Sequence, residues 1–153
     1  MNQAFWLLGT HLNVLADEET TGGRYDLIEG RFLPNVATPL HRHTAYSEHL
    51  YVLEGEFTVR TEATTVVVKP GENFLIPQGI VHSVACGSAP GRGIVVASPS
   101  GCARLIKTAG TVAAPNSLPP TAPPDMEVLA RASAEAGDEI VGPPPTGAAL
   151  AAA

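Results

Sequence analysis

The chain has 153 residues and a formal net charge of −6 at pH 7; hydrophobic residues make up 44% of it and charged residues 16%. This size suits a single domain with a real core, and the acidic balance excludes the basic surface that nucleic-acid binding needs. The N-terminal stretch MNQAFWLLGTHLNVLA has no basic start and its apolar run is interrupted, so we expect two strands there and neither a signal peptide nor a membrane span. Cys86 and Cys102 have no zinc-type spacing, so we expect buried, inert thiols and a reducing cytoplasmic location.

Residues 1–107 have the pattern of an all-β domain. Short runs rich in β-branched and aromatic residues alternate with Gly and Pro turns at intervals of roughly 8–12 residues, which is typical of a sandwich or barrel. In the segment after Thr21, alternation predicts that Tyr25, Leu27 and Phe32 lie on the half-buried side of a strand. The expected strands lie in the segments TGGRYDLIEGRFL, EHLYVLEGEFTVRTE, TTVVVK, NFLIP, IVHSVAC and GRGIVVASP.

Residues 108–153 differ in composition. Small residues and proline dominate TAGTVAAPNSLPPTAPP, which predicts an extended arm without a core of its own. Asp125 is placed to N-cap a short helix over about residues 126–136, and Gly137 is placed to end it. The final stretch, GPPPTGAALAAA, is expected to be a mobile tail.

Chemistry-bearing residues concentrate in HRHTAYSEHLYVLEG, residues 41–55. His41 and His43 are two positions apart, so on a strand both imidazoles lie on one face. Glu48 follows after a short gap, and Gly55 stands where the hairpin needs a flexible backbone. Further along, Gly71, Pro77, Gly79 and His82 form the pattern G-x5-P-x-G-x2-H.

Together, H-x-H-x4-E-x6-G and G-x5-P-x-G-x2-H resemble the two motifs of the cupin superfamily, over about residues 25–100. The second motif usually ends in asparagine, where this chain has Cys86. The resemblance implies a single small jelly-roll barrel, followed here by the proline-rich arm and one short helix. It also implies that His41, His43, Glu48 and His82 bind one divalent metal. Zinc is the expected ion, and Fe, Ni, Co, Mn or Cu are alternatives.

The neighbours Glu48 and His49 leave the strand register open. Neighbouring side chains on a strand face opposite ways, and both alternating sets that follow are apolar. If Glu48 faces inward, the site has three histidines and a carboxylate; if His49 does, it has four histidines and is a stronger Lewis acid. The family pattern favours Glu48. His11 is expected to be a surface or strand-edge histidine.

The expected interior is apolar, which suits a small, hydrophobic, oxygen-bearing ligand. Nearly the whole chain resembles two groups of small cupins: aromatic polyketide cyclases of the resistomycin type and quercetinase-like dioxygenases. We favour a metal-dependent cyclase that closes rings of an aromatic polyketide precursor, because the extra imidazole at His49 suits a non-redox Lewis acid. The alternatives are a flavonol dioxygenase and a non-enzymatic small-molecule binder. Glu48 is the candidate catalytic base, and a homodimer is expected. The interior positions are Phe32, Leu50, Val52, Phe57, Phe74, Ile76, Val84 and Val95.

Overall fold

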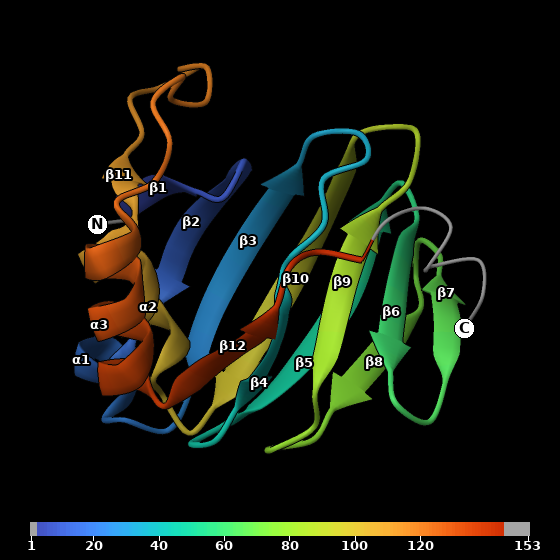
Figure 1. The fold of residues 1–153 in the computed structure, drawn as a ribbon, viewed down its shortest axis with the longest axis horizontal. Coiled ribbons are helices and arrows are strands. Elements are labelled where there is room, and N and C mark those ends of the chain that lie inside the picture. Colours follow the sequence, from blue (N-terminus) through green and yellow to red (C-terminus); the bar gives the residue numbers. More distant parts are fainter. Residues whose placement is uncertain (1–2, 146–153) are drawn as a thin grey trace.

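The computed structural model describes residues 3–145 and shows two antiparallel β-sheets that face one another (Figure 1). The larger sheet has the strand order β11-β1-β2-β3-β10-β5-β8, and the smaller has β12-β4-β9-β6-β7. Non-consecutive strands are therefore neighbours in both sheets, as in a jelly roll. The all-β jelly-roll fold expected from the sequence is confirmed.

The element bounds follow the turn residues of the sequence. The strands are β1 (Gln3–Leu7), β2 (Thr10–Ala16), β3 (Asp26–Phe32), β4 (Leu40–His43), β5 (Ser47–Glu54), β6 (Phe57–Thr61), β7 (Thr65–Val68), β8 (Asn73–Ile76), β9 (His82–Cys86), β10 (Gly91–Ser98), β11 (Thr111–Val112) and β12 (Asp138–Gly142). The helices are α1 (Glu18–Thr21), α2 (Cys102–Ala109) and α3 (Met126–Ala136). Gly55 links β5 to β6 with φ of 73°, and a Cβ there would lie 2.6 Å from the Pro90 carbonyl oxygen. Only glycine fits this turn without rearrangement.

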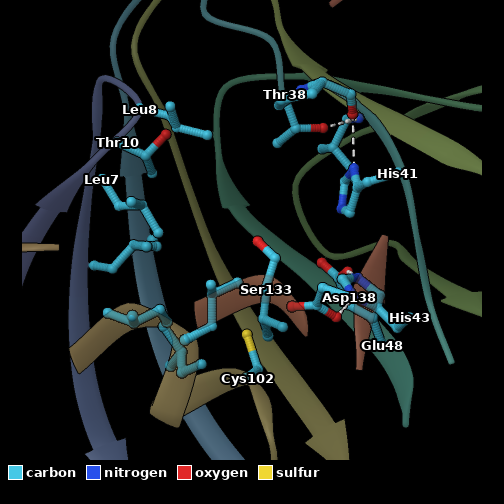
Figure 2. A pocket seen from close by; sticks show the side chains of 18 of the residues that line it. Leu7, Leu8, Thr10, Thr38, His41, His43, Glu48, Cys102, Ser133 and Asp138 are labelled. Atoms are coloured by element: carbon cyan, nitrogen blue, oxygen red, sulfur yellow. Dashed lines mark hydrogen bonds and ion pairs between the residues drawn. The ribbon is translucent and has the colours of Figure 1, made fainter. Parts of the chain in front are cut away.

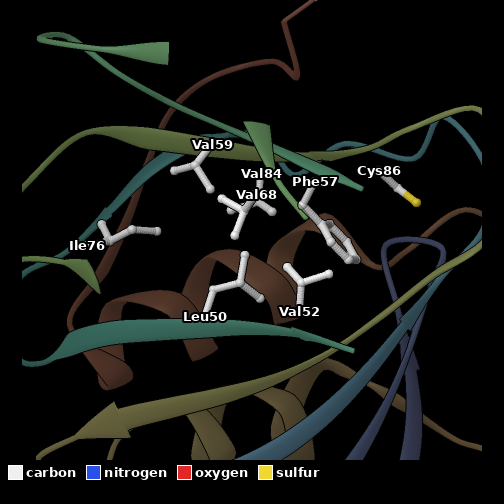
Figure 3. Close-up of a cluster of buried hydrophobic side chains, with 8 residues drawn as sticks. All are labelled: Leu50, Val52, Phe57, Val59, Val68, Ile76, Val84 and Cys86. Atoms are coloured by element: carbon white, nitrogen blue, oxygen red, sulfur yellow. The ribbon is translucent and has the colours of Figure 1, made fainter. Parts of the chain in front are cut away.

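One end of the barrel interior is filled by aliphatic and aromatic side chains (Figure 3). Strand β5 alternates cleanly there: Leu50 and Val52 are buried, whereas Tyr51 is exposed. Phe57 is fully buried and meets Phe32 edge to face, with ring centroids 5.0 Å apart. Burial of a side chain of this size contributes on the order of 2–3 kcal/mol, so this end of the barrel supplies much of the fold's stability.

The expected inward series on β3 is wrong at Tyr25 and Leu27, whereas Phe32 does pack against the barrel core. Tyr25 is exposed, and the buried residues of the strand are Asp26, Ile28 and Gly30. The carboxylate of Asp26 accepts hydrogen bonds from the backbone N–H groups of Gly101 and Ala103, at 2.9 and 2.8 Å. Asp26, a buried acid on β3 that binds backbone N–H groups at the start of α2, therefore sets this register. Apolar alternation alone does not reveal it.

The helices gather beside the β1–β2 end of the larger sheet (Figure 1). Only α3 lies where a helix was expected; α1 and α2 are additional. The segment after Lys107 is also more structured than a simple arm: β11 pairs with β1, and α3 buries Leu129 and Ala132. Strand β12, which the sequence analysis did not predict, pairs with β4 at the edge of the smaller sheet. The arm is thus docked on the barrel over much of its length.

Three smaller expectations can also be compared with the structure. His11 is not at a strand edge, because β2 lies between β1 and β3, and its ring meets Trp6 edge to face. In the expected mobile tail, residues 142–145 are described and residues 146–153 lie outside the described residues. Among the described helices, none is long and apolar enough to cross a membrane.

Candidate metal centre

Three imidazoles meet on the inner face of the smaller sheet. His41 and His43 lie two apart on β4, and His82, the first residue of β9, is directly opposite His41 in the strand register. The ring centroids of His41 and His82 are 4.3 Å apart, and those of His43 and His82 are 5.0 Å apart. The period of two along β4 and the pairing of β4 with β9 together bring all three rings to one point.

Glu48 completes this cluster from β5 of the larger sheet. One of its carboxylate oxygens lies 2.7 Å from Nε2 of His43 and 3.4 Å from Nε2 of His82. One donor atom from each of the four residues lies within 4.8 Å of all the others. The four residues that the sequence analysis named are thus brought together, and this cluster is able to hold a metal ion.

Each imidazole is oriented by its other nitrogen. Nδ1 of His41 lies 2.6 Å from the Pro39 carbonyl oxygen, and Nδ1 of His82 lies 2.8 Å from that of Ile80. A carbonyl only accepts, so both Nδ1 atoms carry the proton and both Nε2 atoms present a lone pair. This is the usual arrangement of metal-binding histidines.

His82 gives an independent test of fit. Its side chain is fully buried, and its Nε2 has no hydrogen-bond partner among the described residues. An unsatisfied buried polar atom destabilises a fold by about 1–3 kcal/mol. A divalent ion between this nitrogen and the other three donors would satisfy it, so the residues present fit a metal.

Electrostatics in the cluster are strongly perturbed. Burial, with the neighbouring imidazoles of His82 and His43, lowers the pKa of His41 to about 4. Burial also opposes the charge on His43, but hydrogen bonds to Asp138 and Glu48 outweigh it and raise the pKa of His43 to about 9. For Glu48 burial is likewise outweighed, by the hydrogen bond to His43 and by the nearby His82, so its pKa lies well below the usual value. Glu48 is therefore an ionised carboxylate, the form that binds metals.

The open register is settled by geometry. His49 is exposed, and its Nε2 lies 2.8 Å from the side-chain oxygen of Asn73 on the outer face of the sheet. Glu48 faces the three histidines instead. The four-histidine arrangement that includes His49 is not the one the structure forms.

Two residues of the cluster were missed by the sequence analysis. Asp138, the first residue of β12, is buried and its carboxylate lies 2.6 Å from Nδ1 of His43. Tyr46 is fully buried, stacks on His43 with ring centroids 4.5 Å apart, and donates its hydroxyl proton to Asp138 at 3.0 Å. Gly137, followed by the β-branched run in DEIVG and by prolines, was a signal for a strand at this place.

The cluster opens onto a cavity of about 160 Å³ between the sheets and the helices (Figure 2). Its walls are mainly aliphatic, with the hydroxyls of Thr10, Thr38 and Ser133 as isolated polar groups, and no Lys or Arg is among the described residues that line it. Cys102 borders it as a free thiol whose pKa burial raises well above the usual value. Cys102 is partly buried against the core residues of β1–β3 and α2, whereas Cys86 is buried as expected.

Half of the expected interior residues line this cavity and half do not. Phe32, Leu50, Val84 and Val95 belong to its wall. Val52, Phe57, Phe74 and Ile76 belong to the filled end of the barrel. The missing part of the wall comes from β1, β2 and the helices, as Leu7, Leu12, Ile106 and Leu129.

Comparison with known proteins agrees with this architecture. Residues 29–97 match the cupin domain family. Over 71 residues the chain is 35% identical to Germin-like protein 1 of Brassica napus, an alignment that covers 42% of this chain and 34% of the relative. The chain therefore spans about a third of the length of this curated relative.

Two solved structures illustrate the similarity. An RmlC-like cupin from Shewanella frigidimarina superposes with a TM-score of 0.57 at 23% identity, over 65% of this chain and 86% of that one. The polyketide cyclase RemF from Streptomyces resistomycificus superposes with a TM-score of 0.53 at 33% identity, over 60% of this chain and 66% of that one. The first likeness concerns the fold alone.

Proposed function

Because the chain belongs to the cupin superfamily and carries a three-histidine, one-carboxylate cluster at the end of an apolar cavity, we propose that it is a metal-dependent polyketide cyclase. Its reaction would be aldol-type ring closure of an aromatic polyketide precursor. The observation that carries the proposal is the cavity wall, which has no lysine or arginine among its described residues. Such a wall suits a neutral, carbonyl-bearing chain and not a sugar phosphate.

The proposed ligands are His41, His43, Glu48 and His82. A divalent ion held there, with zinc our first choice and Fe, Ni, Co, Mn or Cu as alternatives, would supply a Lewis acid for carbonyl oxygens. Glu48 is both a candidate ligand and the candidate catalytic base. Its low pKa suits a ligand and makes it a weak base at neutral pH, so we place proton removal by its carboxylate second.

The protein would contribute mainly by shaping the substrate. Aliphatic side chains on β1, β2 and the helices form a wall that folds a flexible chain and excludes water. The hydroxyls of Thr10, Thr38 and Ser133 are the isolated polar groups available to orient carbonyl groups. The 33% identity to a polyketide cyclase supports the same substrate class.

A flavonol dioxygenase is the second candidate, and one observation favours it. The inward Glu48 gives a site of three histidines and a carboxylate, and it removes the extra imidazole at His49 that had favoured a non-redox Lewis acid. In this candidate, Glu48 takes the proton of a flavonol hydroxyl. The apolar wall of the same cavity also suits a flat apolar ligand, and it allows a third candidate, a non-enzymatic small-molecule binder.

An anaerobic assay separates the candidates. Protein loaded separately with zinc, iron, manganese, nickel or cobalt is incubated with a linear poly-β-ketone thioester mimic or with a flavonol, with and without oxygen. Cyclised, dehydrated product formed without oxygen supports the cyclase, whereas ring-cleaved product formed only in air replaces it by the dioxygenase. If the protein binds a ligand but turns over neither substrate with any of the metals, the result supports the non-enzymatic binder. His82→Ala should abolish turnover, and His49→Ala, a matched histidine outside the cluster, should not.

A homodimer and a cytoplasmic location remain part of this proposal. The free thiols of Cys86 and Cys102 fit a reducing location. Exposed apolar side chains on the outer faces of β5 and β8, including Tyr51 and Leu75, support self-association. Sedimentation at micromolar concentration should find the dimer, and a monomer would remove it from the proposal.

A further inference from the structure

The anchor of His43 differs from the anchors of the other two histidines. His41 and His82 are each held by the carbonyl of the residue two positions before them, a contact that their own loop provides. His43 is held by the carboxylate of Asp138, which is 95 positions away in the sequence. One of the three imidazoles is therefore oriented by a charged group from the C-terminal arm.

We infer that Asp138 is a positioning residue of the metal centre, which fixes His43 with Nε2 toward the metal and strengthens that nitrogen as a donor. This inference rests on the proposed metal site. An imidazole whose Nδ1–H points to a carboxylate can present only Nε2 as a lone pair. The negative charge also polarises the ring, so Nε2 becomes a better ligand, and such outer partners change metal affinity by roughly 10–100-fold.

The backbone around Asp138 is built to deliver this carboxylate. In the pairing of β12 with β4, Asp138 lies directly opposite His43. The preceding Gly137 ends α3 in a left-handed conformation with φ of 80°, and a Cβ on it would lie 2.9 Å from that of Ala45. The backbone N–H and the hydroxyl of Thr44 both donate to the Gly137 carbonyl, at 2.8 and 2.6 Å.

The second carboxylate oxygen is also fixed. Tyr46 donates to it at 3.0 Å, and the same tyrosine stacks on the His43 ring. Asp138 is 5% exposed, so water competes little for either oxygen. A carboxylate at such a buried position is costly for the fold, and an apolar residue would cover the barrel edge at lower cost. A role toward His43 accounts for this cost, whereas a purely structural acceptor for one hydroxyl does not.

Cobalt binding tests the inference directly. Co²⁺ affinity is measured by chelator competition, and the visible absorption bands of the bound ion report its ligand geometry. Asp138→Ala should weaken Co²⁺ binding by about 10–100-fold and change the bands. Asp138→Asn, which retains an acceptor for Nδ1 without the charge, should give an intermediate affinity with bands close to the wild-type ones.

Glu139→Gln is the matched control. Glu139 is the next residue on β12, is exposed, and pairs with Arg42 at 2.6 Å across the same two strands. It should leave affinity and bands unchanged, because its loss loosens the strand pair without touching His43.

The outcomes are distinguishable. Wild-type affinity and bands in both Asp138 variants would overturn the positioning role and leave the metal site intact. If Asp138→Ala fails to fold by circular dichroism, Asp138→Asn decides, and wild-type behaviour in it overturns the inference. A wild-type protein that binds neither Co²⁺ nor Zn²⁺ would overturn the proposed metal site and this inference together.

Discussion

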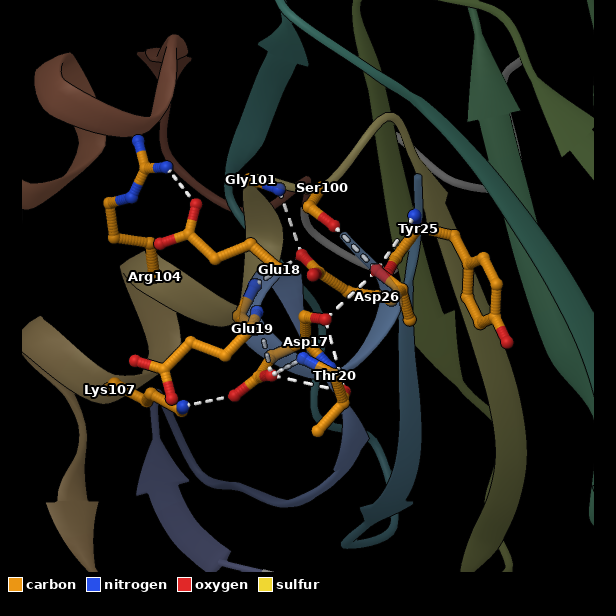
Figure 4. A network of polar contacts seen from close by, with 12 residues as sticks. Asp17, Glu18, Glu19, Thr20, Tyr25, Asp26, Ser100, Gly101, Arg104 and Lys107 are labelled. Carbon is orange, nitrogen blue, oxygen red and sulfur yellow. Dashed lines mark hydrogen bonds and ion pairs between the residues drawn. The ribbon is translucent and has the colours of Figure 1, made fainter. Parts of the chain in front are cut away.

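Two of the clusters of titratable side chains in the described part of the chain are built on opposite rules. The first is the metal cluster of His41, His43, Glu48 and His82. The second, the helix network, joins Asp17 and Glu18 at the start of α1 to Lys107 and Arg104 of α2 (Figure 4). The helix network lies largely at the surface, whereas the metal cluster is mostly buried.

In the helix network each charge has an opposite partner. Lys107 pairs with Asp17 and Arg104 with Glu18, and Asp17 also accepts the N–H groups of Glu19 and Thr20 as a helix cap. Each of these four side chains has a partner of opposite charge, and the contacts hold α1 against α2.

The metal cluster instead crowds three groups of the same kind around one carboxylate. It leaves the buried Nε2 of His82 without a hydrogen bond. Such an arrangement is unfavourable for folding alone, and the crowding of three imidazoles around one carboxylate distinguishes the metal cluster from the helix network. Four variants test this distinction.

The largest effect is expected for His82→Ala. Removing this nitrogen deletes a proposed ligand. Metal affinity should therefore fall by more than the roughly 10–100-fold expected for the loss of a residue that only orients a ligand. Elemental analysis of protein purified without added metal should find near one equivalent in the wild type and little in the variant. The metal should also stabilise the wild type by about 2.7 kcal/mol at a hundred times its Kd, an effect the variant should lack. Full occupancy in the variant would place His82 with the structural groups.

A smaller contrast separates the neighbours Glu48 and His49. Glu48→Gln should weaken metal retention, because a charged ligand becomes a neutral one. His49→Ala should keep the metal and should change the free energy of unfolding by about 1 kcal/mol or less, the value of its hydrogen bond to Asn73. Paired chelator titrations measure the first effect and urea unfolding the second. The reverse pattern would mean that the strand register in solution is shifted by one residue.

The smallest effect is expected in the helix network and depends on pH. The hydrogen bond to Lys107, with those from Thr20, lowers the pKa of Asp17 to about 2 from its ordinary 3.8. A lowered pKa means that the ionised form stabilises the fold above about pH 4, and that this stability is lost as pH falls through about 2. Asp17→Asn, which still caps the helix, should therefore cost at most about 1 kcal/mol at pH 6.

That cost should shrink toward zero as the pH approaches 2, when it is measured by urea unfolding of both proteins across this range. A pH-independent cost would show that the cap, and not the ion pair with Lys107, is what Asp17 supplies.

The sequence was sufficient for the barrel and for the histidines, because both depend on local spacing. Turn residues such as Gly55 and the two-residue period at His41 and His43 act over a few positions, and the structure follows them. The choice between Glu48 and His49 depended on the partner strands, and both alternating sets on β5 are apolar. Only the pairing of β5 with β10 and β8 resolves it.

The expectations that failed involve contacts between distant segments. Asp26 is buried because it caps a helix that begins at Cys102, so the alternation read from Tyr25 was wrong. Asp138 joins the cluster because β12 returns to β4. The proline-rich composition of residues 108–124 gives no indication that the chain returns to the barrel after α3.

The return of β12 to β4 also has a consequence for biosynthesis. Ribosomes make the chain from the N-terminus, so the barrel strands and all four proposed ligands emerge before Asp138 does. During that interval His43 lacks the Asp138 carboxylate, and the edge of β4 that β12 later covers is unpaired. We therefore expect the nascent domain to pass through a stage with a folded barrel but a loosely organised cluster. The site would then reach its full metal affinity only after β12 has docked on β4. Docking of β12 would therefore determine when the metal site matures.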